Sequence, residues 1–267
     1  MNDTHDPADI DNSLTLAIDI GGSHLKVGIV DEAGAILGER RRVATPDPAV
    51  PADVVAALVG LVNPEGGAPL GRFDRISIGF PGVVRNGRVL TAPNLGTRRW
   101  HRFALAAALE EALGKPVRML NDASVQGLGA ISGQGIELVL TLGTGMGFAL
   151  FADGRLAPHL EMGQHLARRR KTYDAYIGEA ALAAVGKRHW NKRVRRAISA
   201  MKTLVGYDVL YIGGGNAKSL AAPLPARVRT VSNEAGVTGG VRLWDRRLDA
   251  MFKEPAPAFV LAAPVGQ

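Results

Sequence analysis

The amino-acid sequence predicts an α/β protein in which two units repeat one order of strands and helices. The 267 residues are 46% hydrophobic and 21% charged, which is typical of a globular protein with one large or two smaller domains. Apolar runs of strand length alternate with runs of helical spacing, and 33 glycines with 15 prolines supply turns between them. After residue 115 this order begins again, which favours a duplicated architecture.

The first unit is expected to begin with three strands in an antiparallel meander, because its apolar or alternating runs are separated by short glycine-containing turns. These strands are predicted at residues 14–20, 26–32 and 35–44. Helical spacing of apolar residues then predicts helices over 52–62 and 102–114, with a buried strand over 73–80 between them. Gly114 and Pro116 are expected to end the second helix.

The repeat is expected to start with a short strand over residues 116–120 and a helix over 121–131, followed by a hairpin. The hairpin strands are predicted at 137–143 and 147–154, later helices at 173–185, 187–205 and 239–251, and a further strand at 207–215. We place the domain boundary near the end of the short strand expected over 116–120, giving domains 14–119 and 120–253. Residues 1–13 and 254–267 are expected to form a disordered lead-in and a loose tail.

The net charge of +7 is concentrated in one segment, which indicates an anionic partner without specifying its kind. Between Arg168 and Arg196, ten lysines and arginines are balanced only by Asp174 and Glu179. On the predicted helix 187–205 the apolar residues share one face and the cations another. A nucleic acid, a lipid surface, a polyanionic substrate or simple solvation would each account for such a face.

Cysteine is absent, which excludes disulfides, thiol nucleophiles and cysteine-based zinc sites. The longest uncharged run, Leu138–Ala152, has 15 residues and contains three glycines, so it is too short and too interrupted to span a bilayer. The first thirteen residues lack the basic and apolar regions of a signal peptide. We therefore expect a soluble cytoplasmic protein without a membrane partner.

Three glycine-rich turns each follow an apolar strand, where glycines let backbone N–H groups converge on an anion. Neither a Walker A loop nor a G-x-G-x-x-G dinucleotide motif is present. A plain hairpin would account for one such turn, but three in series favour a phosphate site. Asp19, at the end of a buried strand, would suit a hydrated Mg²⁺ beside phosphates. The candidate phosphate-donor contacts are Asp19, Gly21, Gly22, Ser23, Lys26, Gly143, Thr144, Gly145, Gly147, Gly214, Gly215 and Asn216.

The three turns, in this order, resemble those of the superfamily of acetate kinase, sugar kinases, Hsp70 and actin. Its two ribonuclease-H-like domains clamp a nucleotide or phosphate donor in the cleft between them. Within it, the segments DIGGSHLKVGIV, GFPGVV, APNLG, LNDASVQGLGA, LTLGTGMG and YIGGGNAK resemble the ROK sugar kinases. KTYDAYIGEAAL and GKRHWNKRVRRAI are similar to segments of bacterial polyphosphate glucokinases. The resemblance implies a homodimer that phosphorylates the 6-hydroxyl of glucose, or of mannose, from polyphosphate or ATP with Mg²⁺.

The same resemblance assigns roles at the sugar site. It implies that Asp122 is the general base that takes the proton of the 6-hydroxyl, and that Asn121 binds a neighbouring hydroxyl. Gly82, Asn94 and Glu161 match positions that line the sugar site in the family. Without the resemblance, Asp122 would equally fit a helix cap. Phosphoryl transfer needs little beyond one base, two backbone cradles and Mg²⁺, because positioning and charge neutralisation stabilise its transition state.

Departures from the family pattern concern sugar specificity and zinc. Gln164 stands where the family has a histidine, with His165 one residue later, and glutamine forms hydrogen bonds but carries no charge. Asp174 replaces a glutamate that contacts the sugar near its anomeric end, so a reshaped pocket or a bridging water is expected there. We keep all three as candidate sugar contacts and leave the preferred hexose open. The family's zinc-binding cysteine cluster is absent, and no zinc is expected.

Basic residues between the sugar loop and the third glycine-rich turn favour a long anionic donor. Polyphosphate carries roughly one charge per unit, so a row of cations would bind it with strong salt dependence. ATP needs fewer cations, and the GGGN turn could hold its adenosine side. The order of preference between the donors is left open. The candidate polyphosphate contacts are Arg188, Lys192, Arg195 and Arg196.

Other functions are compatible with parts of the sequence. Gln164 and Asp174 motivate an ATP-dependent kinase for another hexose, or a catalytically weak sugar-binding ROK protein, although Asp122 argues against lost chemistry. A sugar-responsive repressor would need a DNA-reading domain, and only about thirteen residues precede the first predicted strand. A nucleic-acid binder is disfavoured, because aromatic residues make up 5% of the chain and do not interleave with the basic run.

Overall fold

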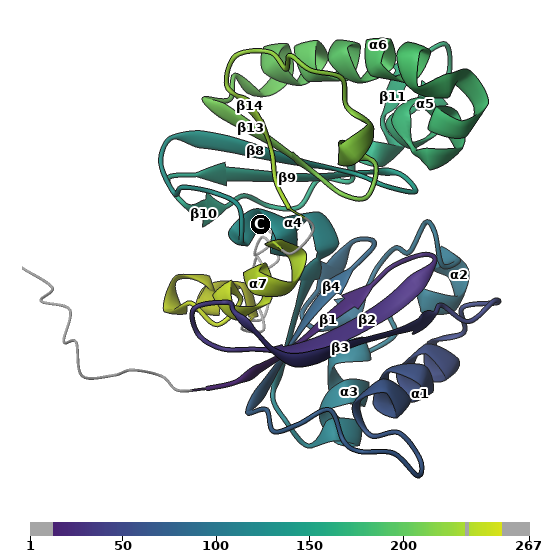
Figure 1. Cartoon of the computed structure of the whole chain (residues 1–267), viewed down its shortest axis with the longest axis vertical. Coiled ribbons are helices and arrows are strands. Elements are labelled where there is room, and N and C mark those ends of the chain that lie inside the picture. The colour runs from purple at the N-terminus through teal and green to yellow at the C-terminus, as the bar shows by residue number, and fades with distance from the viewer. Residues whose placement is uncertain (1–12, 233–234, 253–267) are drawn as a thin grey trace, which may run out of the picture.

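The computed structural model describes residues 13–232 and 235–252, which form two sheets that lie one above the other in Figure 1. Each sheet has five strands and carries helices on its outer face, and the helices α4 (Asp122–Leu128) and α7 (Ala235–Arg242) lie between the sheets (Figure 1). The predicted α/β class and the repeated order of elements are therefore confirmed. The expected lead-in and tail lie outside the described residues, apart from Ser13.

The first sheet has the order β3-β2-β1-β4-β7. Its strands are β1 (Thr15–Ile20), β2 (His24–Val30), β3 (Ile36–Ala44), β4 (Arg75–Phe80) and β7 (Val117–Asn121). The three-strand antiparallel meander is confirmed, and β4 and β7 add to it in parallel. Because β1, β4 and β7 run in parallel, their carboxyl ends meet at one edge, where Asp19 pairs with Gly79, and Phe80 with Asn121.

The second sheet has the order β10-β9-β8-β13-β14 and again joins an antiparallel hairpin to parallel strands. Its strands are β8 (Ile136–Leu142), β9 (Met146–Ala152), β10 (Arg155–Leu156), β13 (Val209–Gly213) and β14 (Val228–Thr230). Thr141 of β8 pairs with Gly147 on one side and Gly213 on the other. The second and third glycine-rich turns therefore lie side by side at the end of β8.

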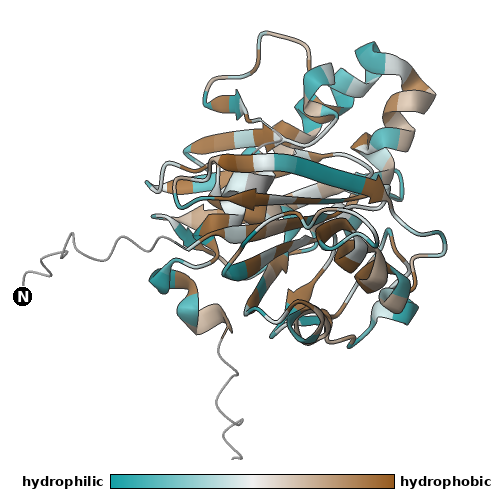
Figure 2. Ribbon diagram, turned by 60° about the horizontal axis from the view of Figure 1, so that its bottom comes forward, coloured by the Kyte–Doolittle hydropathy of each residue, from teal (hydrophilic) through white to brown (hydrophobic). Residues whose placement is uncertain are grey.

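Apolar side chains fill the space between each sheet and its outer helices, which are α1 (Pro51–Val62), α3 (Leu105–Leu113), α5 (Tyr173–Ile177) and α6 (Glu179–Val205). In Figure 2 the hydrophobic colouring lies mainly on the strands. Trp100 and Trp190 are fully buried, and each indole N–H donates to a backbone carbonyl, so neither leaves an unpaired polar group in the core. The apolar and basic faces predicted for helix 187–205 are confirmed, with Val194 and Met201 buried and Arg188 and Lys192 exposed.

Short elements complete the fold, and apart from the two that fall within the helix expected over 239–251 they were not predicted. They are β5 (Val84–Arg85), β6 (Arg88–Val89), α2 (Thr97–Trp100), β11 (Leu166–Arg168), β12 (Lys171–Thr172), α8 (Asp249–Phe252), and the 3-10 turns Met162–Gln164, Ala217–Ser219 and Arg246–Leu248. Strands of two or three residues carry too little periodicity to be recognised in a sequence.

Three predicted elements are wrong in extent or place. The strand expected over 116–120 is β7, which completes the first sheet instead of opening the second unit, because it pairs with β4. The helix expected over 173–185 breaks at Gly178, where extended backbone separates α5 from α6. The interruption at Gly186, with φ of 71°, falls where the sequence separated the helices 173–185 and 187–205. The helix expected over 239–251 begins at residue 235 and ends at 242, because Asp245 caps a separate turn.

The helices α4 and α7 connect the two sheets through close backbone contact. A side chain at Gly239 of α7 would overlap the carbonyl of Val125 in α4, and one at Gly240 would press on Ala17 and Ser77 of the first sheet. Ser77 also donates a hydrogen bond of 2.6 Å to the carbonyl of Gly240. The helix α7 is therefore fixed both to the first sheet and to α4.

Candidate active site

A cavity of about 210 Å³ opens between the carboxyl edges of the two sheets. A second cavity, of about 220 Å³, shares Asp19, Lys26, Asp122 and Gly143 with it and extends to the third glycine-rich turn. Sixteen predicted site residues line the two cavities, namely Asp19, Gly21, Gly22, Lys26, Gly82, Asn94, Asn121, Asp122, Gly143, Thr144, Gly145, Gly147, Glu161, Asp174, Gly214 and Gly215. Four predicted residues, Ser23, Gln164, His165 and Asn216, are not among the lining residues.

Asp122 lies at the junction of β7 and α4, where the sequence places two functional side chains in succession. The side-chain oxygen of Asn121 accepts from the backbone N–H of Ala123 at 3.0 Å and caps α4. The side-chain amide of Asn121 donates to the carbonyl of Gly82 at 3.2 Å, which ties α4 to the loop after β4. With Asn121 acting as the cap, Asp122 is left as the first helical residue with its carboxylate turned to the cavity.

The electrostatic environment of Asp122 favours its protonated form. Burial, then the nearby carboxylate of Asp19 and more weakly that of Glu161, raise the pKa of Asp122 from 3.8 to about 7. The N–H of Ala123, which donates to Asp122 Oδ1 at 2.7 Å, and His159 act in the opposite direction. A carboxyl with a pKa near neutrality exchanges a proton readily at physiological pH, as a general base must.

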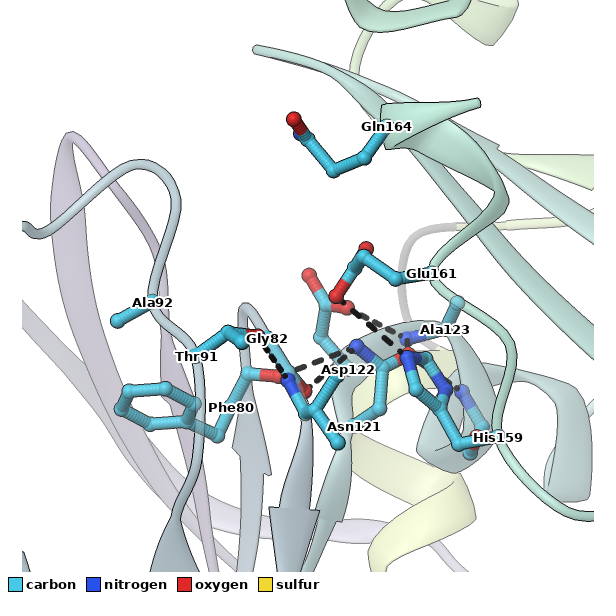
Figure 3. A network of polar contacts seen from close by, with 12 residues as sticks. Phe80, Gly82, Thr91, Ala92, Asn121, Asp122, Ala123, His159, Glu161 and Gln164 are labelled. Carbon is cyan, nitrogen blue, oxygen red and sulfur yellow. Dashed lines mark hydrogen bonds and ion pairs between the residues drawn. The ribbon is translucent and has the colours of Figure 1, made fainter. Parts of the chain in front are cut away.

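Glu161 and His159 approach the Asn121–Asp122 junction from the second sheet's side of the cleft (Figure 3). His159 Nε2 lies 3.6 Å from Glu161 Oε2, beyond hydrogen-bond distance. Both ring nitrogens and that carboxylate oxygen are buried without a hydrogen-bond partner among the described residues. Three unsatisfied polar atoms beside a cavity indicate groups poised for a polar ligand or an ordered water.

Sequence reasoning missed His159 and Gln126. His159 stands in a loop between Pro158 and Leu160, and no sequence pattern distinguishes it. Gln126 is buried and lines the second cavity. It follows Asp122 by four residues on α4, a spacing that puts two side chains on one helix face and could have identified it.

The first glycine-rich turn presents an ion pair to both cavities. Lys26 lies directly opposite Asp19 in the β1–β2 ladder, and its ammonium donates to Asp19 Oδ2 at 2.8 Å. Among the described residues no hydrogen bond reaches the other carboxylate oxygen of Asp19. Mg²⁺ takes one or two carboxylates and completes its shell with water and phosphate, so this single free oxygen beside a glycine-lined cavity fits the ion. No group of three His, Asp or Glu side chains that could hold a metal occurs in the described part of the chain.

The second and third turns are hydrogen-bonded to each other. Asn216 donates from its backbone to the carbonyl of Leu142 at 2.9 Å and from its side chain to that of Gly143 at 3.1 Å. Gly214 has a φ of 85°, and a side chain there would overlap the Leu142 carbonyl, so glycine is required at this position. Asn216, predicted as a donor contact, thus holds the second turn in place.

Gln164 and His165 differ from the prediction in where their side chains lie. Figure 3 shows Gln164 apart from Asp122 and Glu161. Its amide donates to Asp174 Oδ2 at 2.6 Å, while the ring of His165 is exposed and stacks on Tyr173 with 6.5 Å between centroids. Asp174 lines the first cavity as predicted but is already engaged in hydrogen bonds.

The basic face of α6 divides into two groups. Lys187, Arg188, Lys192 and Arg195 line a shallow groove with Asn191 and Ala221. Arg196, predicted to belong with them, instead reaches the hydroxyl of Tyr176 at 3.5 Å. Asn191 ties the groove to the segment that follows the third glycine-rich turn, because its side chain binds the carbonyl of Ser219 and the N–H of Ala221.

Comparison with known sequences identifies a family and several relatives of this chain. The sequence model of the ROK family matches residues 15–165. The polyphosphate glucokinase of Mycobacterium tuberculosis (strain CDC 1551 / Oshkosh) is 32% identical over 243 residues, which cover 83% of this chain and 88% of the relative. The polyphosphate glucokinase of Mycobacterium leprae (strain TN) is 33% identical over 242 residues, which cover 83% and 72%.

Two solved structures share this fold. The inorganic polyphosphate/ATP-glucomannokinase from Arthrobacter sp. strain KM superposes with a TM-score of 0.78 at 32% identity, over 86% of this chain and 98% of the other. A ROK family glucokinase from Streptomyces griseus, solved with glucose and AMPPNP, superposes with a TM-score of 0.70 at 21% identity, over 86% and 98%. The latter supports the fold alone. In the described part of the chain no helix has the length and hydrophobicity to cross a bilayer.

Proposed function

The chain belongs to the ROK family, and from this premise we propose that it phosphorylates glucose, and mannose as a second acceptor, at the 6-hydroxyl. The fold is that of the two-domain superfamily of actin, Hsp70 and sugar kinases. The single observation that carries the proposal is Asp122, a carboxyl with a raised pKa that lines both the cavity beside Glu161 and the cavity beside the glycine-rich turns. An acceptor hydroxyl and a donor phosphate would meet at this carboxyl.

In the proposed reaction Asp122 accepts the proton of the 6-hydroxyl as the hydroxyl oxygen attacks the terminal phosphorus of the donor. The bond from that phosphorus to its bridging oxygen breaks, and ADP or a polyphosphate shortened by one unit leaves. Asn121 and Glu161 bind other hydroxyls, and Gly82 and Asn94 bound the same cavity, so the sugar is held with one oxygen at Asp122. The backbone of the glycine-rich turns and the ammonium of Lys26 surround the donor phosphates. Positioning of this kind accounts for most of the catalysis in phosphoryl transfer.

The site of Asp19 suits Mg²⁺, which when bound would neutralise charge on the donor phosphates. Asp19 would hold the ion through its free carboxylate oxygen, directly or through water. Lys26 would keep the other oxygen in place through its 2.8 Å hydrogen bond. The raised pKa of Asp122 depends partly on the negative charge of Asp19, so a cation there would also favour the ionised base.

We propose polyphosphate as a donor alongside ATP, and the basic groove of α6 supports this. Its cations lie beyond the third glycine-rich turn, where a chain longer than a triphosphate would extend from the cleft. Arg195 donates to the carbonyls of Ala221 and Pro223, which hold its side chain but leave its positive charge in the groove beside Lys187, Arg188 and Lys192. A row of such cations binds a polyanion in a strongly salt-dependent manner.

The donor proposal is tested by reversing charge in the groove. Arg188→Glu with Lys192→Glu should raise the KM for long-chain polyphosphate at least tenfold and change the KM for ATP by less than about threefold, since three phosphates held at the glycine-rich turns need not reach the groove. Arg196→Glu is the matched control, because it makes the same change on the same helix but on the Tyr176 side. Equal losses with both donors, or an equal effect of the control, would contradict the assignment.

A second candidate, a kinase for another hexose, is favoured by one observation. Gln164 and Asp174 bind each other, so two of the expected sugar contacts are partly occupied. The experiment is a panel of glucose, mannose and other hexoses at saturating donor, with formation of the sugar phosphate measured directly. A kcat/KM for another hexose well above that for glucose would favour this alternative.

A further inference from the structure

The carboxylate of Asp174 joins the two loops that face each other across the donor and sugar sides of the cleft. Its Oδ1 accepts a hydrogen bond of 2.7 Å from the backbone N–H of Met146, at the end of the second glycine-rich turn. Its Oδ2 accepts a hydrogen bond of 2.6 Å from the side-chain amide of Gln164, in the loop that carries Glu161. One carboxylate thus holds one loop with each oxygen, and we call this arrangement of Asp174, Gln164 and Met146 the bracket.

The packing around this carboxylate leaves no freedom for a larger neighbour. A Cβ atom at Gly145 would lie 2.5 Å from Asp174 Oδ1, and one at Gly163 would overlap the same oxygen. Glycine is thus present on both loops at the points where the carboxylate passes between them. The close fit indicates that neither loop can move far without disturbing the other.

Asp174 also connects the second glycine-rich turn to the helices that follow. It lies in the first turn of α5, whose position is fixed by the Thr172 hydroxyl cap. At the end of α5, the N–H of Gly178 donates to the Asp174 carbonyl, and the next N–H, of Glu179, donates to the Gly143 carbonyl at 2.8 Å. The second glycine-rich turn is therefore held from both ends by the α5–α6 segment.

We propose that Asp174 and Gln164 are positioning residues that couple acceptor binding to donor binding, so that a sugar held at Glu161 orders the 143–146 turn for the donor phosphate. This inference rests on the proposed sugar kinase function. Gln164 does not line the cavity, and its amide points to Asp174, so its contribution runs through that carboxylate. Two ligands that order the same bracket each bind more tightly in the presence of the other.

The charge state of the bracket gives the proposal a specific test. Burial raises the pKa of Asp174, and the nearby Glu161 carboxylate adds to that effect. Gln164→Glu would place a further carboxylate directly against Asp174, so at a pH where both are ionised the hydrogen bond is lost and the two side chains repel. Adding Asp174→Asn restores a donor and an acceptor, because the new amide can donate to the carboxylate introduced at position 164 and still accept from Met146.

The experiment measures binding of a non-hydrolysable ATP analogue, and separately of long-chain polyphosphate, with and without saturating glucose. In the wild-type protein glucose should tighten donor binding about fivefold or more, a normal size for coupling between two sites. Gln164→Glu should abolish the tightening, and Gln164→Glu with Asp174→Asn should restore most of it. The matched control is Gln134→Glu, the same change at an exposed residue away from both cavities.

Thermal unfolding of each variant checks that the fold is kept, since a change in stability alone would not alter the ratio of donor affinities with and without sugar. Wild-type coupling in Gln164→Glu, or a double variant no better than the single one, would overturn the inference. Absence of coupling in the wild-type protein would do the same, even if glucose 6-phosphate forms. Coupled binding without formation of a sugar phosphate would instead overturn the proposed function and leave the bracket standing.

Discussion

Replacing Asp122 by asparagine should have opposite effects on activity and on stability. The fold should be kept, because asparagine has nearly the same shape and retains the oxygen that accepts from the Ala123 N–H. Activity should fall by roughly 10² to 10⁴ in kcat, the usual cost of removing a general base. Stability should rise, because the wild-type protein must hold an ionised carboxylate where burial, Asp19 and Glu161 oppose it.

The magnitude of the stability gain follows from the pKa of Asp122, which is raised from 3.8 to about 7. Between these values the folded protein retains a proton that the unfolded chain has lost, so the wild-type free energy of unfolding decreases as the pH rises. At 1.36 kcal/mol per pKa unit, the full difference is roughly 4 kcal/mol, reached above about pH 7. Asparagine does not ionise, so the variant escapes this loss.

The assay is thermal unfolding of wild-type protein and Asp122→Asn from pH 4 to pH 8, with kcat measured on the same samples. The two melting temperatures should nearly coincide at about pH 4 and separate by roughly 8 to 16 °C at pH 8, because roughly 2 to 4 °C corresponds to each of the roughly 4 kcal/mol for a protein of this size. A difference that does not change with pH, or a variant less stable at pH 8, would refute the electrostatic reasoning. An unchanged kcat would remove Asp122 from the proposed mechanism.

Further predictions concern the neighbours of Asp122 and the close packing between the loops. The kcat/KM of the wild-type enzyme should fall about tenfold per pH unit below the pKa of Asp122, which is about 7 without a cation at Asp19 and lower with one. Glu161→Gln removes a charge that raises the pKa of Asp122, so the acidic limb of the pH profile should move to lower pH. His159→Gln removes a group that lowers this pKa, so the limb should move to higher pH. Shifts in the same direction would contradict this reasoning. Gly163→Ala should lower kcat/KM at least tenfold, because the new methyl group would overlap the carboxylate of Asp174 between the loops. The control is Gly60→Ala, in an open position of α1, which should leave kcat/KM unchanged and raise stability by up to about 1 kcal/mol.

The sequence predicts the strands that carry the site because the determining features are local. Each glycine-rich turn directly follows an apolar strand, and parallel pairing of β1, β4 and β7 then brings Asp19 and Asn121 to the same edge. The Asn121–Asp122 pair is likewise a local signal, since a helix cap and a functional carboxylate stand in succession. For these residues spacing along the chain determines position in space.

Residues whose roles depend on contacts between distant segments could not be predicted. Gln164 and Asp174 matched sugar-binding positions, and only the folded chain shows that they bind each other and Met146. His159 has no local pattern and becomes notable through its place beside Glu161. The basic face of α6 was predicted correctly, but the contact of Arg196 with Tyr176 was not. Two neighbouring cations on one helix face, such as Arg195 and Arg196, can meet different partners.

The strand expected over 116–120 was assigned to the wrong unit for a related reason. The strand 117–121 carries the same apolar signal whether it begins one sheet or ends another, and its pairing with β4 decides the matter. The helix α7 ends at residue 242, and Asp245 then accepts from the N–H of Arg247 and caps a new turn. Both features arise from hydrogen bonds that periodicity does not encode.

The central claim is tested most directly by formation of glucose 6-phosphate by the purified protein with Mg²⁺, comparing polyphosphate with ATP and using Asp122→Asn as the blank. The account predicts turnover with polyphosphate and with ATP, reduced at least roughly a hundredfold in the variant. Absence of glucose 6-phosphate with either donor, or equal turnover by the Asp122→Asn variant, would contradict it.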